Sequence, residues 1–122
     1  MIDRDAMIDK VRRAREATPE YELPPKAAFL ESFRFIRALP DRIAHAPAIK
    51  TSPMEVRLSW RTDRAKILVG FYGDGEGGSY VMERFNFKGT VSDRVACDDF
   101  KAEEPPAPLL HTIASWKPED SA

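Results

Sequence analysis

The stretch that decides the fold is residues 55–87, EVRLSWR-TDR-AKILVGFYG-DGEGG-SYVMERFNF. In its first segment, Val56, Leu58 and Trp60 alternate with charged or polar residues. An alternation of period two is typical of a strand that buries one face and exposes the other. A second segment, residues 67–72, is apolar on both faces and rich in β-branched and aromatic residues. That pattern indicates a central strand of the same sheet.

The connections in this stretch are short, and they predict antiparallel pairing. Residues 62–64 suffice for a tight turn, and residues 73–78, GDGEGG, include several that tolerate positive φ. A parallel crossover would need about a dozen residues or more. The third segment, residues 79–87, therefore completes an antiparallel sheet, and its alternation puts Tyr80 and Arg84 on one face.

Two helices are predicted before the sheet. Residues 3–17 carry apolar side chains at a spacing of three to four. Residues 26–39 follow a proline pair, which suits a first helical turn, and they carry an apolar stripe with Phe29 and Phe33. Aromatic residues at helical spacing are typical of a core rather than of a ligand box. We expect Trp60 to be buried or half-buried against Phe29 and Phe33.

The region after the sheet is less regular. Residues 91–100 fit either a fourth, irregular strand or a loop, and residues 101–108, KAEEPPAP, form a Pro-rich linker. Residues 109–116 predict a short helix that either docks on the domain, which we expect, or serves as a partner-binding tail. We divide the chain into one α+β domain, residues 1–100, and a segment of linker and short C-terminal helix or tail, residues 101–122.

The predicted fold class is thus α+β. Two N-terminal helices pack on one face of a three- to four-stranded antiparallel sheet, and a short C-terminal helix follows. The length of 122 residues, with 43% hydrophobic and 32% charged residues, fits one domain with its own core. The net charge of −1 gives no overall attraction to nucleic acid or to anionic membranes.

Composition also indicates the cellular compartment of the protein. The chain has one cysteine, Cys97, which excludes an internal disulfide and a metal site built on cysteine pairs. It has no apolar run near 18 residues, and its N-terminus is charged from Asp3 onward. We therefore expect neither a membrane span nor a signal peptide, and we predict a cytoplasmic protein.

The sequence contains no complete set of catalytic residues in a known motif. The Gly-rich residues 73–78 precede a strand rather than a helix, so they predict a hairpin turn and not a phosphate loop. The two histidines lack zinc-binding spacing. Asp98 and Asp99 beside Cys97 would raise a thiol's pKa, which opposes its activation. We expect no catalytic residue, no cofactor and no metal. A hydrolase-like site of His111 with Asp98 or Asp99 is the least favoured alternative.

The sheet face away from the helices is the candidate binding surface. Arg57 and Arg61 share one face of the first strand, and we expect Tyr72 and Tyr80 near them. Protein interfaces favour mixed arginine and tyrosine surfaces. The wet face of a half-covered sheet would carry the same basic residues, so both interpretations stay open. The predicted partner-binding residues are Arg57, Arg61, Tyr72, Tyr80, Arg84, Asp98 and Asp99.

These observations favour a non-enzymatic module that binds another protein, as a monomer or as a homodimer paired through an open strand edge. The alternative is a nucleic-acid-binding accessory protein, in which basic residues of the first helix act with Arg57 and Arg61 of the sheet face. The cluster on the helix comprises Lys10, Arg12, Arg13 and Arg15. It lacks interleaved aromatic residues for base stacking, and such clusters are usually solvated helix faces.

The order of three segments also carries a resemblance. A Pro-led helix ends in FLESFRFIRALP (residues 29–40), a strand ends in LSW (58–60), and VGFYGDG follows (69–75). This layout resembles small uncharacterised bacterial α+β proteins, many of them from mobile-element or defence neighbourhoods. The resemblance covers residues 24–85, with TSPM in place of a Gly-rich turn before the first strand. It implies a compact inhibitor-like or antitoxin-like binder and transfers no catalytic residue.

Overall fold

The structure is a computed structural model, and it describes residues 2–43, 45–74 and 77–116. The last part of the predicted C-terminal tail, residues 117–122, lies outside the described residues. The helical elements are α1 (Arg4–Ala17), the 3₁₀ turn η1 (Glu20–Glu22), α2 (Lys26–Arg37) and α3 (Ala107–Ala114). The strands are β1 (Ile2–Asp3), β2 (Arg42–Ile43), β3 (Ala48–Ser52), β4 (Glu55–Arg61), β5 (Ala65–Phe71), β6 (Gly78–Phe85) and β7 (Val91–Phe100).

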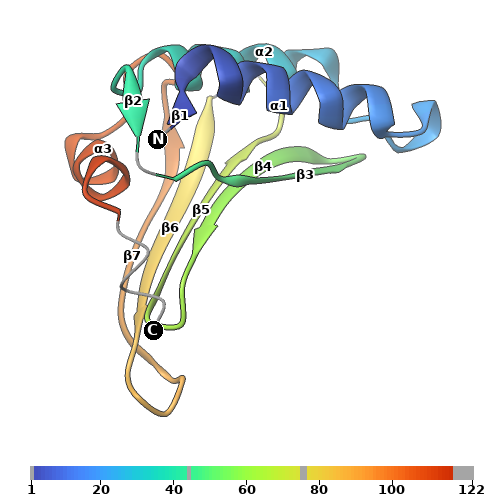
Figure 1. Ribbon diagram of the computed structural model, residues 1–122. Helices are drawn as coiled ribbons and strands as arrows, with labels where there is room; N and C mark the ends of the chain where they lie inside the picture. Colours follow the sequence, from blue (N-terminus) through green and yellow to red (C-terminus); the bar gives the residue numbers. More distant parts are fainter. Residues whose placement is uncertain (1, 44, 75–76, 117–122) are drawn as a thin grey trace.

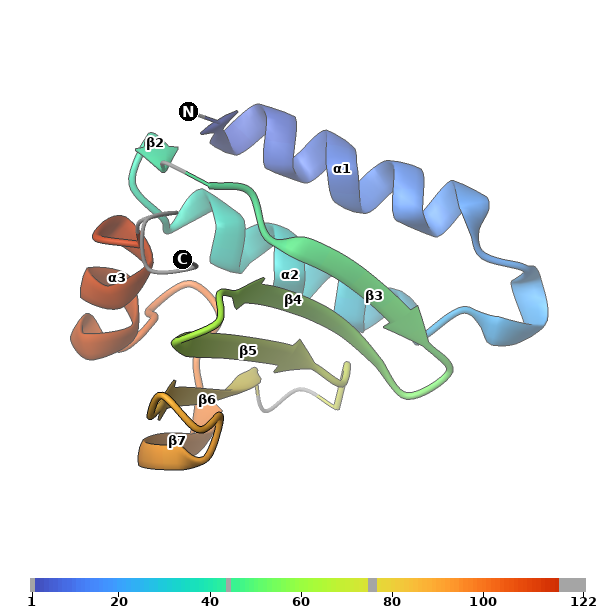
Figure 2. The same ribbon diagram turned by 60° about the horizontal axis from the view of Figure 1, so that its bottom comes forward.

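Five strands form one antiparallel sheet in the order β3-β4-β5-β6-β7. The helices α1 and α2 lie side by side on one side of it, and α3 lies beside the β6–β7 end (Figures 1 and 2). The predicted α+β class, with two N-terminal helices on an antiparallel sheet and a short C-terminal helix, is confirmed. The sheet has five strands rather than three or four, because β3 adds an edge strand and β7 is a full strand of 10 residues.

A second, two-stranded sheet ties the N-terminus to the segment after α2. The strand β1 pairs antiparallel with β2, so that Ile2 lies opposite Ile43. Beside it, the Arg4 guanidinium donates a hydrogen bond of 2.8 Å to the carbonyl oxygen of Arg37 and pairs with the Asp41 carboxylate. Two-residue strands carry no alternation pattern, so the sequence did not predict them.

The core lies between the helices and the covered face of the sheet. Alternation along β4 buries Val56, Leu58 and Trp60, as the sequence predicted. Trp60 is 2% exposed, and its indole Nε1 donates a hydrogen bond of 2.9 Å to the carbonyl oxygen of His45. Phe29 of α2 is 1% exposed and belongs to the same core cluster. Phe29 and Phe35 of α2 are therefore core residues, and Phe33 is half-buried and packs against the core.

An aromatic cluster joins α2 to both central and outer strands. The ring of Phe35 lies 5.4 Å from that of Phe71 on β5 and 5.9 Å from that of Phe100 on β7, between centroids. Gly78 lies opposite Phe71 in the ladder. A Cβ atom at position 78 would lie 2.7 Å from the Phe71 ring and 3.0 Å from the Phe100 ring. Only glycine leaves room there for both rings.

The C-terminal helix docks on the domain, as expected. Leu109 and Ile113 of α3 are 0% and 1% exposed, and Trp116 just after it is 7% exposed. All three belong to the one core cluster. None of the helices formed by the described residues is long and apolar enough to cross a membrane.

We predict that Phe35→Ala lowers the free energy of unfolding by about 3–5 kcal/mol, because it removes a fully buried ring and leaves a cavity. The matched control is Phe87→Ala, since Phe87 is 95% exposed, and it should change stability by less than about 0.5 kcal/mol. Urea unfolding measures both. Equal effects of the two substitutions would contradict the core described here.

Candidate interaction surface on the uncovered sheet face

The face of the sheet away from the helices is formed by the alternate residues of each strand. The arrangement that buries Val56, Leu58 and Trp60 directs Arg57 and Arg61 to the other side. Over the described residues, α1 and α2 leave this side uncovered (Figures 1 and 2). We call it the open face. Strand pairing arranges its side chains in rows that cross the sheet.

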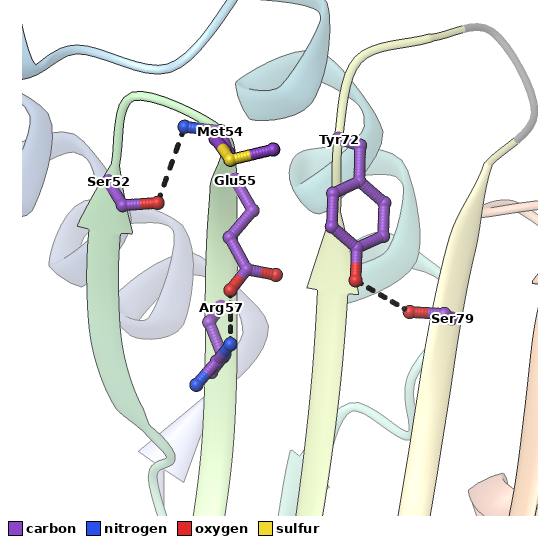
Figure 3. A network of polar contacts seen from close by, with 6 residues as sticks. All are labelled: Ser52, Met54, Glu55, Arg57, Tyr72 and Ser79. Carbon is purple, nitrogen blue, oxygen red and sulfur yellow. Dashed lines mark hydrogen bonds and ion pairs between the residues drawn. The ribbon is translucent and has the colours of Figure 1, made fainter.

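The first row is a polar cluster at one end of the open face (Figure 3). Glu55 and Arg57 form an ion pair, and the Tyr72 hydroxyl lies 3.3 Å from Ser79 Oγ, within hydrogen-bonding distance. Gly70 lies between the two pairs, opposite Arg57 on one side and Ser79 on the other. A Cβ atom at position 70 would lie 2.7 Å from Glu55 Oε2, so glycine gives the carboxylate its place on the sheet. The Glu55 side chain is accordingly only 12% exposed.

The middle row is mainly apolar. Ser59 lies opposite Leu68, Leu68 opposite Val81, and Val81 opposite Ala96. Leu68 and Val81 belong to the central strands β5 and β6, and both are half-buried. The row thus gives the open face an apolar centre on the three strands β5, β6 and β7.

The third row is charged and internally paired. Lys66 Nζ lies 3.0 Å from Glu83 Oε1, and Arg94 Nε lies 4.0 Å from Glu83 Oε2. The Arg61 guanidinium carbon lies 5.8 Å from the centroid of the Phe85 ring. The cations that face this side are Lys50, Arg57, Arg61, Lys66 and Arg94, and the carboxylates are Glu55 and Glu83. The open face is therefore locally positive in a chain of net charge −1.

The structure brings three of the predicted partner-binding residues together. Arg57, Arg61 and Tyr72 all lie on the open face and are exposed. The sequence missed the groups that Arg57 and Arg61 contact, Glu55 and Phe85. The alternation in the sequence already placed Glu55 beside Arg57 on the first strand, and that signal could have found the pair. The contact with Phe85 depends on strand register, which the sequence does not show.

Tyr80 does not join them, and this expectation was wrong. Tyr80 lies opposite Val69 in the ladder and shares its covered face. It is 5% exposed, and its ring centroid lies 5.9 Å from that of Phe100. Arg84 points to the same side of β6 and is exposed, opposite Asp93, where it lines a hollow with Thr112 of α3. The alignment of β5 with β6 decides this orientation, and the sequence does not show that alignment.

The predicted acidic residues lie at the far end of β7. The pairing of β6 and β7 shifts between Gly78 and Tyr80, so that Asp98 and Asp99 form an irregularity opposite Ser79. Both are exposed. His111 is exposed on α3, and none of five surface hollows over the described residues is lined by it or by these aspartates. The described residues include no group of three or more side chains that could hold a metal ion.

Most of the basic cluster on α1 contacts other parts of the chain. Lys10 Nζ donates a hydrogen bond of 2.6 Å to the carbonyl oxygen of Pro47. The guanidinium carbons of Arg12 and Arg15 lie 5.7 Å and 5.1 Å from the ring centroids of Phe33 and Phe29, respectively. These three cations hold α1 against α2 and against the segment that leads to β3. Arg13, the fourth member of the cluster, is exposed.

Comparison of the chain with family models, with curated proteins and with solved structures found no match. The resemblance to small bacterial proteins therefore stays a prediction.

Tyr80 gives a pH-dependent prediction. Burial raises the pKa of Tyr80 above its ordinary value of 10.0, and the charge of neighbouring Cys97 raises it further. Folding therefore favours the neutral phenol, and its contribution to stability is complete below about pH 10 and is lost as the pH rises above that value. We predict that Tyr80→Phe loses less stability than the wild type between about pH 9 and pH 11.

Urea unfolding across this range measures the difference. The control is Tyr21→Phe, since Tyr21 is 83% exposed, and it should follow the wild-type profile. If the free energy of unfolding depends on pH in the same way for Tyr80→Phe and for the wild type, the buried position of Tyr80 is contradicted.

Proposed function

We propose that the protein is a non-enzymatic module that binds another protein through the open face. The observation that carries this proposal is the apolar row through Leu68 and Val81 in the centre of an uncovered sheet. A row of half-buried aliphatic side chains gains free energy when a partner removes it from water.

The surroundings of this row match the anatomy of protein interfaces. Protein interfaces are apolar at their centre and are enriched in arginine and tyrosine relative to the rest of the surface. Here Arg57 and Tyr72 lie on one side of Leu68, and Arg61 lies on the other. Each arginine is already held by a contact within the chain, Arg57 by Glu55 and Arg61 by Phe85. Less side-chain entropy is then lost when a partner binds.

The charge of the open face favours an acidic partner. Five cations face this side against two carboxylates. Complementary charge accelerates association and selects against positively charged competitors. An inhibitor-like or antitoxin-like role is the finer form of this proposal, and its support is the resemblance of residues 24–85 to bacterial proteins of defence neighbourhoods.

A nucleic-acid-binding function through α1 gains no support from the contacts of that helix. All four cations of the predicted cluster are exposed, but Lys10, Arg12 and Arg15 each already contact another part of the chain. We therefore propose that the open face binds a protein.

We predict that the double substitution Arg57→Ala and Arg61→Ala reduces recovery of a co-purifying host protein at least about tenfold, since arginine is enriched among interface hot spots. The measurement is quantitative mass spectrometry after affinity purification of the tagged chain from its native host. The matched control is Arg13→Ala with Arg37→Ala, two exposed arginines on the helical side, which should leave recovery unchanged.

Melting temperatures of both double variants show that the fold is intact. Wild-type protein that purifies without a stoichiometric partner, or a partner that is retained equally by both double variants, would contradict binding through the open face.

A further inference from the structure

The hairpin of β6 and β7 ends in an exposed aromatic side chain. This turn, at the bottom of Figure 1, projects beyond the helices and beyond the other strands. Phe87 at the turn is 95% exposed, the highest exposure among the large hydrophobic residues of the described chain. An isolated exposed phenylalanine needs no explanation by itself. Three further observations indicate a role for Phe87.

The turn holds Phe87 outward in a fixed conformation. The Asn86 side-chain oxygen accepts hydrogen bonds from the backbone amides of Lys88 (2.9 Å) and Thr90 (3.1 Å). The Gly89 amide donates to the Asn86 carbonyl oxygen over 2.9 Å, and Gly89 has φ of 82°, which favours glycine. The turn is thus organised before any ligand binds, and less conformational entropy is lost on binding.

A hollow of about 710 Å³ lies beside Phe87. Its walls are the β4–β5 turn and the β6–β7 turn, joined by a hydrogen bond of 2.7 Å from the Phe85 amide to the Arg64 carbonyl oxygen. Phe85 and Phe87 both line it. Lys88 Nζ lies 5.7 Å from the centroid of the Phe87 ring, and the Arg61 guanidinium lies over the Phe85 ring. Each aromatic ring therefore has a cation beside it.

This end of the sheet is positively charged although the chain is not. Arg64 and Lys88 line the hollow against one carboxylate, Asp63, and Arg61 adds to them through its contact with Phe85. Among the described residues, Asp98, Asp99, Glu103 and Glu104 are exposed and lie toward the opposite end of β7, which pairs with Gly78 rather than with Phe85. Asp93, nearer the hairpin, lies opposite Arg84.

We propose that this hairpin end, formed by Arg64, Phe85, Phe87 and Lys88, binds single-stranded nucleic acid. Unpaired bases stack on the phenylalanine rings, and the phosphates contact the neighbouring cations, the combination by which proteins bind single strands without sequence preference. A duplex hides the faces of its bases, so it cannot use the rings. A membrane-inserting turn would carry several apolar side chains, whereas Phe87 is flanked by Asn86 and Lys88.

The hairpin end lies beyond the open-face centre of Arg57, Leu68 and Val81, although the contact between Arg61 and Phe85 belongs to both regions. Substitutions of Phe87 and Lys88 therefore test the hairpin end without changing the open face. The sequence cluster on α1 lacked exposed aromatic residues, and the hairpin end supplies them. Its variants are chosen to leave the shared residue Arg61 untouched.

Fluorescence anisotropy with labelled oligo(dT) and oligo(U) of about 15 nucleotides, at low and rising salt, tests the proposal. We expect binding whose affinity falls with salt, with a logarithmic slope of about −0.7 for each phosphate contacted. Phe87→Ala should raise the Kd about tenfold through lost stacking. Tyr21→Ala removes another exposed aromatic side chain, far from the hairpin in sequence, and should leave the Kd within about twofold.

Charge reversal provides a second matched pair. Lys88→Glu should weaken binding and reduce the salt slope, whereas Arg13→Glu, the same change of charge on α1, should do neither. The proposal is overturned if neither oligonucleotide binds at low salt, or if Arg13→Glu weakens binding as much as Lys88→Glu does. It is also overturned if duplex DNA competes as well as the single strand, or if only anionic lipid vesicles bind the hairpin.

Discussion

The packing of Phe35 from α2 against Phe71 and Phe100 decides which face of the sheet is covered. Successive side chains of a strand point to opposite faces, so burying Phe71 and Val69 commits Leu68 to the other face. Gly78 is part of the same constraint, because any larger residue would collide with two of the rings. One aromatic contact thus sets both the core and the surface that is left for a partner.

The two proposed binding regions follow from this one-sided packing. The helices cover one side of the sheet, which leaves the apolar row through Leu68 and Val81 in water on the other. The turn of the β6–β7 hairpin projects beyond the helices, and there Phe87 and Lys88 are exposed and Phe85 is half-buried. Glu55, Glu83 and Phe85 each hold at least one basic side chain in place.

The parts of the fold that the sequence predicted are those with a strong local pattern. The alternation of Val56, Leu58 and Trp60 gave β4, and the helical spacing around Phe29 gave α2. The strand β3 was missed because its five residues lie between two prolines, a setting that is typical of a turn. The strand β7 was ambiguous because nearly all of its residues are exposed, so no hydrophobic alternation marks it.

The candidate site was predictable only in part, and strand register is the reason. Arg57 and Arg61 share a face by alternation within one strand, which the sequence shows directly. Whether Tyr80 joins them depends on how β5 and β6 align, and a Gly-rich turn does not specify that alignment. The contacts of the α1 cluster depend on tertiary packing in the same way. Arg12 and Arg15 are exposed, as the sequence predicted, and their guanidinium groups also lie near the rings of Phe33 and Phe29.

The most direct test of the one-sided sheet is a comparison of methyl groups that point to opposite faces. We would record methyl NMR spectra of the free protein with a soluble paramagnetic cosolute. The structure predicts strong relaxation enhancement for Leu68 and Val81 and little for Leu58 and Val69, which are both 0% exposed. If the methyl groups of Leu68 and Val81 are as protected from the cosolute as those of Val69, another layer covers the open face, and the account is contradicted.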